Sequence, residues 1–415
     1  MNLARTALVL LLSMGAGVTS AIAEITPDSM ATKRPAREVK IIGQGLVEYN
    51  NNTGRVSAAT AALQSIKAED VIYAPSLDLN IVLPVGRQAV FLRGTGSYEF
   101  HRTNKQLETT RINGAAGIAN RLGPCGTTLT GTYQRGNSQL NDLTLVSRVD
   151  NIFTAKGVNA GVTCIRPPGI GVFATGSYVD TSNSITSVKE NNSRTVGAGG
   201  GIVLGRPTSG SFALLGNYSR SEYPRRTPFA GSRGDFDSVG AGVRVERRLG
   251  GRIQATATVN YTHGRTLQPP LPLPGVPAIN SKFDGITYAG NASFRATSRL
   301  TAQVNFQREL VPTLIAGQSF QIDTSYGASA DYRFGNRFVL SAGAQKQMNR
   351  SQGGVPIGVI ALRSSDTQIY SASARYALNK KLSFTLLGTH EERTANAPEF
   401  DYSGERVGLT ANVNF

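Results

Sequence analysis

The final ten residues of this 415-residue chain form the most constraining pattern in its sequence. From Arg406 to Phe415 they read RVGLTANVNF, in which polar or small residues alternate with apolar ones without a break. Successive side chains of a β-strand point to opposite faces, so this segment predicts a strand with one apolar and one polar face. Such a strand suits a wall between lipid and water, provided that its sheet closes and leaves no unpaired edge.

The same alternation runs through much of the chain. Residues 320–334 carry apolar or aromatic side chains at nearly every even position, and residues 253–261 carry them at every odd position. Only 40% of the residues are hydrophobic and 46 are glycine, which suits strands between lipid and water better than a large dry core. Aromatic residues such as Tyr98, Tyr218 and Tyr261 stand near strand ends, as interfacial girdles require. These patterns predict a transmembrane antiparallel up-and-down β-barrel. A soluble β-sandwich or propeller would not explain the terminal strand.

Short turns alternate with longer connections, as the two ends of an outer-membrane barrel demand. Turn-forming Gly, Pro and Asn mark the short ones at Pro84–Gly86, Gly123–Cys125, Arg166–Gly169, Arg206–Ser209, Gly250–Gly251, Thr297–Ser298, Gly335–Asn336 and Asn379–Lys380. The longer polar connections lie near residues 50–70, 103–109, 136–150, 181–193, 223–235, 265–282, 311–319, 349–365 and 394–402. Counting back from Phe415 gives about 18 strands, with about 16 as the alternative, and places both termini on the periplasmic side.

The start of the chain predicts export. Residues 1–23 contain Arg5, a short apolar run and the small-residue site Ala21-Ile22-Ala23, which together indicate a signal peptide cut before Glu24. Its apolar core is too short for a membrane anchor, and no other segment is long and apolar enough for a transmembrane helix. We therefore expect a periplasmic tail over residues 24–38 and one barrel domain over residues 39–415, located in the outer membrane of a Gram-negative bacterium.

Two connections differ from the rest. Residues 56–70 place apolar side chains at helical spacing, which predicts a short helix in the first external loop or folded into the barrel mouth. Residues 269–277 read PPLPLPGVP, which predicts a stiff external loop tip rather than a docking motif.

Cys125 and Cys164 are the only cysteines of the chain. Cys125 begins one predicted strand and Cys164 ends the next, so antiparallel pairing brings both to the periplasmic rim. In an oxidising compartment this arrangement predicts a structural disulfide across the hairpin.

The chain lacks the sequence signals of an enzyme. His101, His263 and His390 lie near external strand ends, and no GxSxG, HExxH or dense metal-ligand cluster accompanies them. Only His390 stands in a His-carboxylate cluster, with Glu391 and Glu392, and neighbouring strand residues point to opposite faces. We expect no catalytic residues, no metal and no cofactor.

The predicted interior carries the candidate functional residues. Alternation points one set of arginines into the lumen: Arg93, Arg111, Arg121, Arg244, Arg248, Arg252, Arg295, Arg333, Arg375 and Arg406. The inward acids are Asp78, Glu99, Glu246, Glu309, Asp323 and Asp331. A wall lined mainly by one charge concentrates the opposite ion, which favours an anion-preferring pore. The alternative is that these arginines pair with the acids or with lipopolysaccharide phosphates at the rim.

A family resemblance appears in residues 47–102. The Asn-rich strand end VEYNNNT is followed by Pro75-Ser76-Leu77, then by the turn Gly86-Arg87-Gln88 and by a strand from Gly94 to Tyr98. This order resembles the β-barrel outer-membrane porin family of Alphaproteobacteria. Some such barrels are similar to proteins encoded with exopolysaccharide synthesis and export machinery. The resemblance therefore implies a role in moving polysaccharide across the outer membrane.

Three functions stay open at this point. The first is a channel that assists exopolysaccharide export, since a barrel of about 16–18 strands can enclose an aqueous channel. The second is a structural or adhesive barrel with a plugged lumen, and the third is a barrel enzyme acting on lipopolysaccharide or surface polymers. Expected partners are outer-membrane lipids, lipopolysaccharide and the barrel-assembly machinery, and for export also polysaccharide export proteins and an anionic polysaccharide. Nucleic acid is excluded, because the chain is exported and has no basic cluster, and the oligomeric state is left open.

Overall fold

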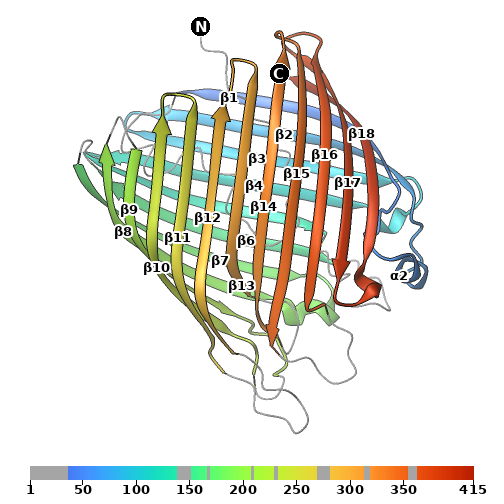
Figure 1. Ribbon diagram of the computed structural model, residues 1–415, viewed down its shortest axis with the longest axis horizontal. Helices are drawn as coiled ribbons and strands as arrows, with labels where there is room; N and C mark the ends of the chain where they lie inside the picture. The colour runs from blue at the N-terminus through green and yellow to red at the C-terminus, as the bar shows by residue number, and fades with distance from the viewer. Residues whose placement is uncertain are drawn as a thin grey trace.

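The chain folds into a single closed barrel of 18 antiparallel β-strands (Figure 1). The computed structural model describes residues 36–137, 151–165, 169–206, 210–228, 232–268, 281–312, 318–353 and 362–415. Each strand pairs with its neighbours in sequence, and β1 also pairs with β18. The predicted fold class and the predicted number of strands are confirmed. The predicted signal peptide (1–23), most of the predicted tail and the proline-rich segment (269–277) lie outside the described residues.

The strands are of similar length and follow one another with little else between them. Their bounds are β1 Glu38–Asn50, β2 Asp70–Val85, β3 Gln88–His101, β4 Thr109–Leu122, β5 Cys125–Asn137, β6 Ile152–Cys164, β7 Gly169–Asn183, β8 Ser193–Arg206 and β9 Gly210–Glu222. The second half consists of β10 Phe236–Leu249, β11 Ile253–Thr266, β12 Lys282–Arg295, β13 Leu300–Pro312, β14 Gln318–Phe334, β15 Phe338–Gly353, β16 Ser364–Ala377, β17 Leu382–Ala395 and β18 Tyr402–Asn414. The described helical segments are α2 Ala58–Leu63, η1 Lys105–Leu107, η3 Thr186–Asn191 and η4 Pro398–Phe400.

Closure of the sheet joins the two ends of the chain. Ile42 of β1 lies opposite Asn414 of β18, and this register continues along both strands. The backbone N–H of Phe415 donates to the carbonyl of Ile41 over 3.0 Å. The ring of Phe415 is 79% exposed on the outer surface and covers Gly43, where an added Cβ would lie 3.3 Å from it. The aromatic end of the chain thus completes the last backbone pairing of the barrel.

Alternation divides every strand into an outward and an inward face. Val90 and Leu92 of β3 are 45% and 43% exposed, whereas Phe91 between them is only 3% exposed. Val407 and Leu409 of β18 are likewise exposed on the outside. A continuous apolar exterior of this kind is unstable in water and matches the hydrocarbon of a bilayer.

One end of the barrel carries tight turns and the other carries the longer connections. Glycines such as Gly123 and Gly335 occupy the turns with φ of 61° and 60°, a region that favours glycine. The predicted turns are present wherever the structure describes them. The predicted helix in the first long connection is also present, as α2, with Ser57 as its N-cap accepting from the Thr60 N–H. We call the two ends the turn end and the loop end.

The outward aromatic residues differ between the two ends. Tyrosines lie at or beyond the middle of their strands towards the loop end: Tyr49, Tyr73, Tyr98, Tyr133, Tyr178, Tyr218, Tyr261, Tyr288, Tyr326 and Tyr370. Near the turn end the outward aromatics are mostly phenylalanine: Phe212, Phe294, Phe334, Phe338, Phe384 and Phe415, with Tyr332 and Tyr376. Aromatic girdles at both interfaces are typical of transmembrane barrels. The tyrosine girdle marks the interface on the loop side.

The strand ladder opens between β12 and β13 near the loop end. Their pairing stops at Tyr288 opposite Arg308, although β12 continues to Lys282 in its pairing with β11. β13 continues instead as a pair with β14, as far as Pro312 opposite Phe320. The β13–β14 hairpin therefore separates from β12 near the loop end.

An apolar cluster closes this separation. Phe236, Phe283 and Phe320 pack together with Leu310 and Ile322, and the ring centroids of Phe236 and Phe320 are 5.6 Å apart. Leu310 and Ile322 occupy outward positions of their strands, whereas Phe236 and Phe283 occupy inward positions. These two sets can meet only if the end of the β13–β14 hairpin lies inside the wall formed by β10–β12.

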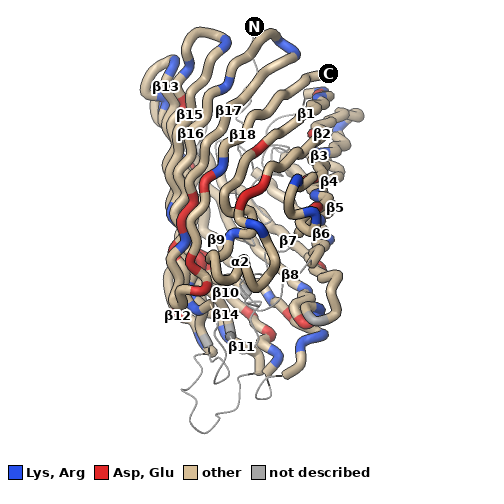
Figure 2. Tube along the Cα trace, turned by 90° about the vertical axis from the view of Figure 1, so that its right-hand side faces the viewer, with Lys and Arg blue, Asp and Glu red and all other residues tan. Residues whose placement is uncertain are grey.

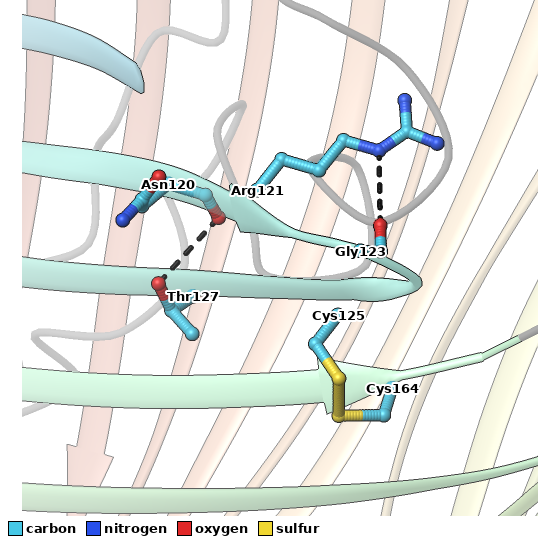
Figure 3. The surroundings of a disulfide bond; sticks show 6 residues. All are labelled: Asn120, Arg121, Gly123, Cys125, Thr127 and Cys164. Carbon is cyan, nitrogen blue, oxygen red and sulfur yellow. Dashed lines mark hydrogen bonds between the residues drawn. A yellow bond between two sulfur atoms is a disulfide. The ribbon is translucent and has the colours of Figure 1, made fainter. Parts of the chain in front are cut away.

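A disulfide crosses the β5–β6 hairpin at the turn end (Figure 3). Cys125 and Cys164 lie directly opposite each other, and their Cα atoms are 3.9 Å apart. Both share the outward parity of Leu129, which is 47% exposed. The bridge predicted from the hairpin register is therefore present in the structure.

We expect removal of this bridge to lower the stability of the barrel without changing its fold. The bond closes a loop with a sequence separation of 39 residues, and loss of that restraint should lower the free energy of unfolding by about 2–4 kcal/mol. The measurement is urea unfolding of the Cys125→Ser/Cys164→Ser variant in lipid vesicles, with chemically reduced wild type as the control. Identical unfolding midpoints for all three proteins would contradict a stabilising bridge.

Candidate functional site: the lumen wall

The inward faces of the strands form the candidate functional surface. In the described strands β5–β9 no inward position carries a charged side chain. The polar residues there are Thr128, Thr130, Thr132, Gln134, Asn159, Thr163, Thr175, Ser177, Thr181, Asn183, Ser193, Thr195, Ser211, Asn217, Ser219 and Ser221. This side of the lumen therefore offers hydroxyl and amide groups, which both donate and accept hydrogen bonds.

Parts of this neutral wall are accessible to water. Asn159 and Thr175 face inward and are nevertheless exposed. Gly197, Gly199 and Gly201 occupy successive inward positions of β8, and the ring of Phe173 lies against Gly201, 2.9 Å from where a Cβ would stand. At Gly197 and Gly199 an added Cβ would also meet a neighbouring hydroxyl, at 2.5 Å and 3.0 Å, so these glycines let neighbouring side chains lie close against the wall.

Most of the predicted lumen arginines lie close to the turn end, where Lys and Arg recur along the edge of the barrel (Figure 2). Arg248, Arg333 and Arg375 occupy inward positions within a few residues of tight turns. Arg248 lies 3.5 Å from the Glu246 carboxylate, and both side chains are well exposed. Arg375 donates from Nη2 to the Ser383 hydroxyl over 3.3 Å.

The remaining arginines of this end, unlike Arg248, lack close acids among the described residues. Arg121 donates from Nε to the carbonyl of Gly123 over 3.4 Å (Figure 3). Arg295 ends β12, and Arg252 lies in the turn after β10, so strand alternation does not place the Arg252 side chain as the sequence predicted. Within the described residues no carboxylate lies within 4.0 Å of the guanidinium groups of the following arginines: Arg121, Arg252, Arg295, Arg333 and Arg375.

Two further predicted arginines lie deeper in the barrel. Arg93 donates from Nε to the Asn80 side-chain oxygen over 2.9 Å. Arg244 of β10 stands 5.2 Å from the centre of the Phe173 ring of β7. A cation over an aromatic face is attracted by its π-system, so Phe173 holds Arg244 without neutralising it.

Arg111 and Arg406 are paired with acids. Arg111 binds Glu99 through its Nε at 2.9 Å and its Nη2 at 2.9 Å. Arg406 donates to Glu391 over 3.2 Å, and both side chains are largely buried. For these two arginines the alternative weighed from the sequence, pairing with acids, describes the structure.

Glu391 is the centre of a buried network at the seam where β1 meets β18. It is 5% exposed and accepts from Arg55 Nη2 at 2.6 Å, from the Tyr402 hydroxyl at 2.6 Å and from Arg406 Nη2 at 3.2 Å. Because Arg55 belongs to the first long connection, this network ties the segment that carries α2 to the inner wall. Glu48 on β1 faces the same region from an inward position.

Sequence reasoning missed Arg55, Glu391 and Glu48. The sequence analysis named Glu391 only beside His390 and did not include it among the inward acids, although its odd position in β17 gives it inward parity. No periodic signal marks Arg55, because it lies in an irregular loop with φ of 52°.

Two other predicted lumen acids, unlike Glu99 and Glu246, accept from neutral side chains. Asp331 accepts from the Ser341 hydroxyl over 2.6 Å, and Asp323 accepts from the Gln321 amide over 2.5 Å. Asp323 lies directly opposite Glu309 in the β13–β14 hairpin. Glu309 and Asp323 therefore lie towards the loop side of the lumen, whereas Asp331 and Glu246 lie near the turn end, on the same strands as Arg333 and Arg248.

The three histidines all pair with carboxylates. His101 Nδ1 lies 3.0 Å from buried Asp70, whose carboxylate also accepts the backbone N–H groups of Thr103 and Asn104. His263 and His390 lie on the outer face, 2.6 Å and 3.7 Å from Asp284 and Glu405. No hydroxyl nucleophile is bonded to any of these histidines in the hydrogen bonds of the described residues, and these residues contain no group of three potential metal ligands.

Two external connections are fixed to each other by a buried arginine. Arg226 is 3% exposed, stacks 3.6 Å from the centre of the Tyr223 ring and donates to the Asn191 side chain of η3. Burial raises the pKa of Tyr223 to about 12 and lowers the pKa of Arg226. Thr227 also donates to Glu190 over 2.7 Å. The β7–β8 and β9–β10 connections thus form one packed unit.

Among the described residues no helix is long and apolar enough to cross a membrane.

The C-terminal third of the chain matches a known family. Residues 277–415 match the family model described as "Putative beta-barrel porin 2". The resemblance to a β-barrel porin family is therefore confirmed, although the motifs that suggested it lie at the other end of the chain. The match does not address the alphaproteobacterial origin, which stays a prediction. No curated protein matches the chain significantly in sequence.

Three solved porin structures align with most of the chain at low sequence identity. The outer membrane protein OpdK of Pseudomonas aeruginosa is 11% identical with a TM-score of 0.46, and the alignment covers 91% of this chain and 99% of OpdK. OccK2 (OpdF) of the same organism is 12% identical with a TM-score of 0.48, covering 91% and 97%. A BenF-like porin of Pseudomonas fluorescens Pf-5 is 12% identical with a TM-score of 0.47, covering 91% and 99%. At this distance nothing about the solute of this chain follows from them.

The Glu391 network generates a prediction about stability. Replacing Glu391 with Ala leaves Arg55 and Arg406 without their shared acid, and breaking a buried ion pair in this way should cost about 3–5 kcal/mol. The adjacent Glu392→Ala variant is the matched control, because Glu392 faces outward and is exposed, and a surface change of this kind costs about 0.5 kcal/mol or less. Urea unfolding in lipid vesicles measures both. Equal losses for the two variants would show that the network does not anchor the seam.

Proposed function

We propose that this chain, a porin-like outer-membrane β-barrel whose C-terminal third matches a porin family model, forms a water-filled channel for hydrophilic solutes. The observation that carries this proposal is the inner surface of the closed 18-stranded sheet. That surface is lined by hydroxyl and amide groups over β5–β9, and inward residues such as Asn159 and Thr175 are exposed. A barrel of this size has room for an aqueous channel.

The charge pattern favours anions at the periplasmic side. Arg333 and Arg375 face inward near the turn end with no carboxylate within 4.0 Å among the described residues, and Arg248 has only one exposed acid nearby. Arginine keeps its charge at every relevant pH. Cations lining a low-dielectric wall attract anions from the periplasm and raise their concentration at the channel entrance.

The substrate we propose is an exopolysaccharide on its way out of the cell. Hydroxyl and amide side chains can exchange hydrogen bonds with successive sugars while none of them binds strongly. Acidic groups on such a polymer would be attracted to the arginines of the turn end. The polymer could then move along the neutral wall without binding tightly to it. Deletion of the protein should reduce secreted polymer, whereas a general diffusion channel would leave secretion unchanged and alter only the uptake of small solutes.

We do not propose an enzymatic role. The buried histidine, His101, is bonded to Asp70, which is occupied by backbone N–H groups of the neighbouring loop. This arrangement stabilises a loop and presents no activated nucleophile.

Reversal potentials in planar bilayers test the anion preference. We expect the wild-type channel to favour chloride over potassium, and Arg248→Gln to shift the reversal potential towards the cation because it removes an inward charge. Replacing Arg333 and Arg375 as well should enlarge the shift.

Arg247→Gln provides the control for this experiment. Arg247 is the neighbour of Arg248 in β10 but points outward, so the same change in net charge occurs on the other face of the wall. A wild-type channel selective for cations, or equal shifts for both variants, would reject a lumen origin of the selectivity. Absence of any conductance would reject the channel itself.

A further inference from the structure

Some charged residues on the outer surface have no role in a channel. They lie at the level of the tyrosine girdle or beyond it towards the loop end, where the outer face of the wall leaves the hydrocarbon. Most of these outward charges on β9–β12 are balanced pairs, such as Arg265 with Asp237 at 3.1 Å and Arg220 with Glu222 at 2.7 Å. Two other regions have an excess of cations.

The first region, which we call patch 1, consists of Arg308, Lys346 and Arg350 on β13 and β15. Lys346 lies opposite Tyr326 of the girdle, and Arg308 lies opposite Tyr288. The hydroxyls of these two tyrosines are 2.6 Å apart.

A single acid serves the three cations of patch 1. Asp366 binds Arg350 at 2.5 Å and Lys346 at 3.4 Å. Arg308 has no carboxylate within 4.0 Å among the described residues, and its Nε is shielded from water without a hydrogen-bond acceptor. A shielded donor without a partner costs free energy unless an acceptor is supplied from outside the chain.

The same arrangement recurs nearly half of the way round the barrel as patch 2, which consists of Arg135 on β5, Lys156 on β6 and Arg194 on β8. Lys156 lies opposite Tyr133 of the girdle. Asp180 is the acid that binds Arg194, at 3.3 Å, whereas Glu222, which lies opposite Arg194, is paired with Arg220. As in patch 1, one arginine, Arg135, has a shielded Nε without an acceptor. Three cations, one acid and a girdle tyrosine thus occur together twice.

From this repetition we propose that patches 1 and 2 bind the phosphate groups of a phosphorylated glycolipid in the outer leaflet, of the lipid A type. Outward cations just beyond a tyrosine girdle stand at the depth of lipid headgroups rather than in the channel. Arginine forms two-pronged hydrogen bonds with phosphate, and lysine adds a point charge. Each patch has two positive charges in excess, which matches a headgroup carrying more than one phosphate.

The remaining outward surface at the loop end differs in sign. Around β17, β18 and the first connections the outward charges include Glu69, Glu392 and Glu405. The phosphate groups of a lipid would be repelled by these three glutamates, unless divalent cations bridged the phosphates and the carboxylates. The proposal therefore predicts lipid at two sites on the wall and not a uniform ring.

The experiment uses the full-length barrel folded in detergent and fluorescent diphosphoryl lipid A as the probe. We expect the wild type to bind the probe and the triple variant R308Q/K346Q/R350Q to bind it at least about tenfold more weakly, because each basic residue that is removed weakens the attraction to an anionic lipid. The corresponding patch 2 variant, R135Q/K156Q/R194Q, should lose affinity similarly. If the patch 1 variant fails to fold, the patch 2 variant tests the proposal by itself. Folding of each variant is judged by heat-modifiable mobility in gels.

The matched control removes three cations from the other end of the barrel. R247Q/R299Q/R337Q has the same loss of charge at the periplasmic side and should bind lipid A like the wild type. Unlabelled diphosphoryl lipid A should displace the probe, and dephosphorylated lipid A and phosphatidylglycerol should not. The proposal would be overturned if the wild type and both patch variants bound the probe equally. It would also be overturned if the control variant lost as much affinity as the patch variants, or if dephosphorylated lipid A displaced the probe. Because none of these outcomes depends on conductance, the proposal stands or falls separately from the channel.

Discussion

Backbone pairing between the first and last strands is the interaction on which the rest of this structure depends. A sheet with free edges would expose unpaired N–H and C=O groups to hydrocarbon, and each such group costs several kcal/mol there. The register from Ile42 opposite Asn414 to Asn50 opposite Arg406 removes both edges at once. Every other property follows from this closure, because only a closed sheet has an inside. The seam is also reinforced at the loop end by Glu391, which holds Arg55 and Arg406 together beside the closing strands.

Much of this fold could be predicted from the sequence, because a strand that separates lipid from water has apolar and polar residues at alternate positions. That period located the strands, ordered the turns and placed Cys125 opposite Cys164. Most of the arginines that this parity assigns to the lumen occupy inward strand positions in the barrel. The period could not show which of them are neutralised, since Arg111 and Arg406 differ from Arg333 only in having an acid within reach. Loop residues such as Arg55 follow no period, and Arg252 lies in a turn where alternation ends.

The distribution of charge gives the barrel a direction. On the inside, unneutralised arginines gather at the turn end, and the acids Glu309, Asp323 and Glu391 lie towards the loop end. On the outside, the excess cations of patches 1 and 2 lie at the loop end, at the level of the tyrosines. The two arrangements face different surroundings, because the inner wall contacts solutes and the outer wall contacts lipid headgroups. The net charge of the chain does not distinguish the inward arginines from the outward cations, which meet different surroundings.

The separation of β12 from β13 has a consequence for the external mouth of the barrel. Elsewhere the circumference is fixed by backbone hydrogen bonds, whose length barely varies. At this separation it is set by side-chain packing of Phe236, Phe283 and Phe320 with Leu310 and Ile322. Apolar contacts have no preferred direction and can slide. The bore at this mouth can therefore widen or narrow by rearranging five side chains, while every rung of the β-ladder below stays intact.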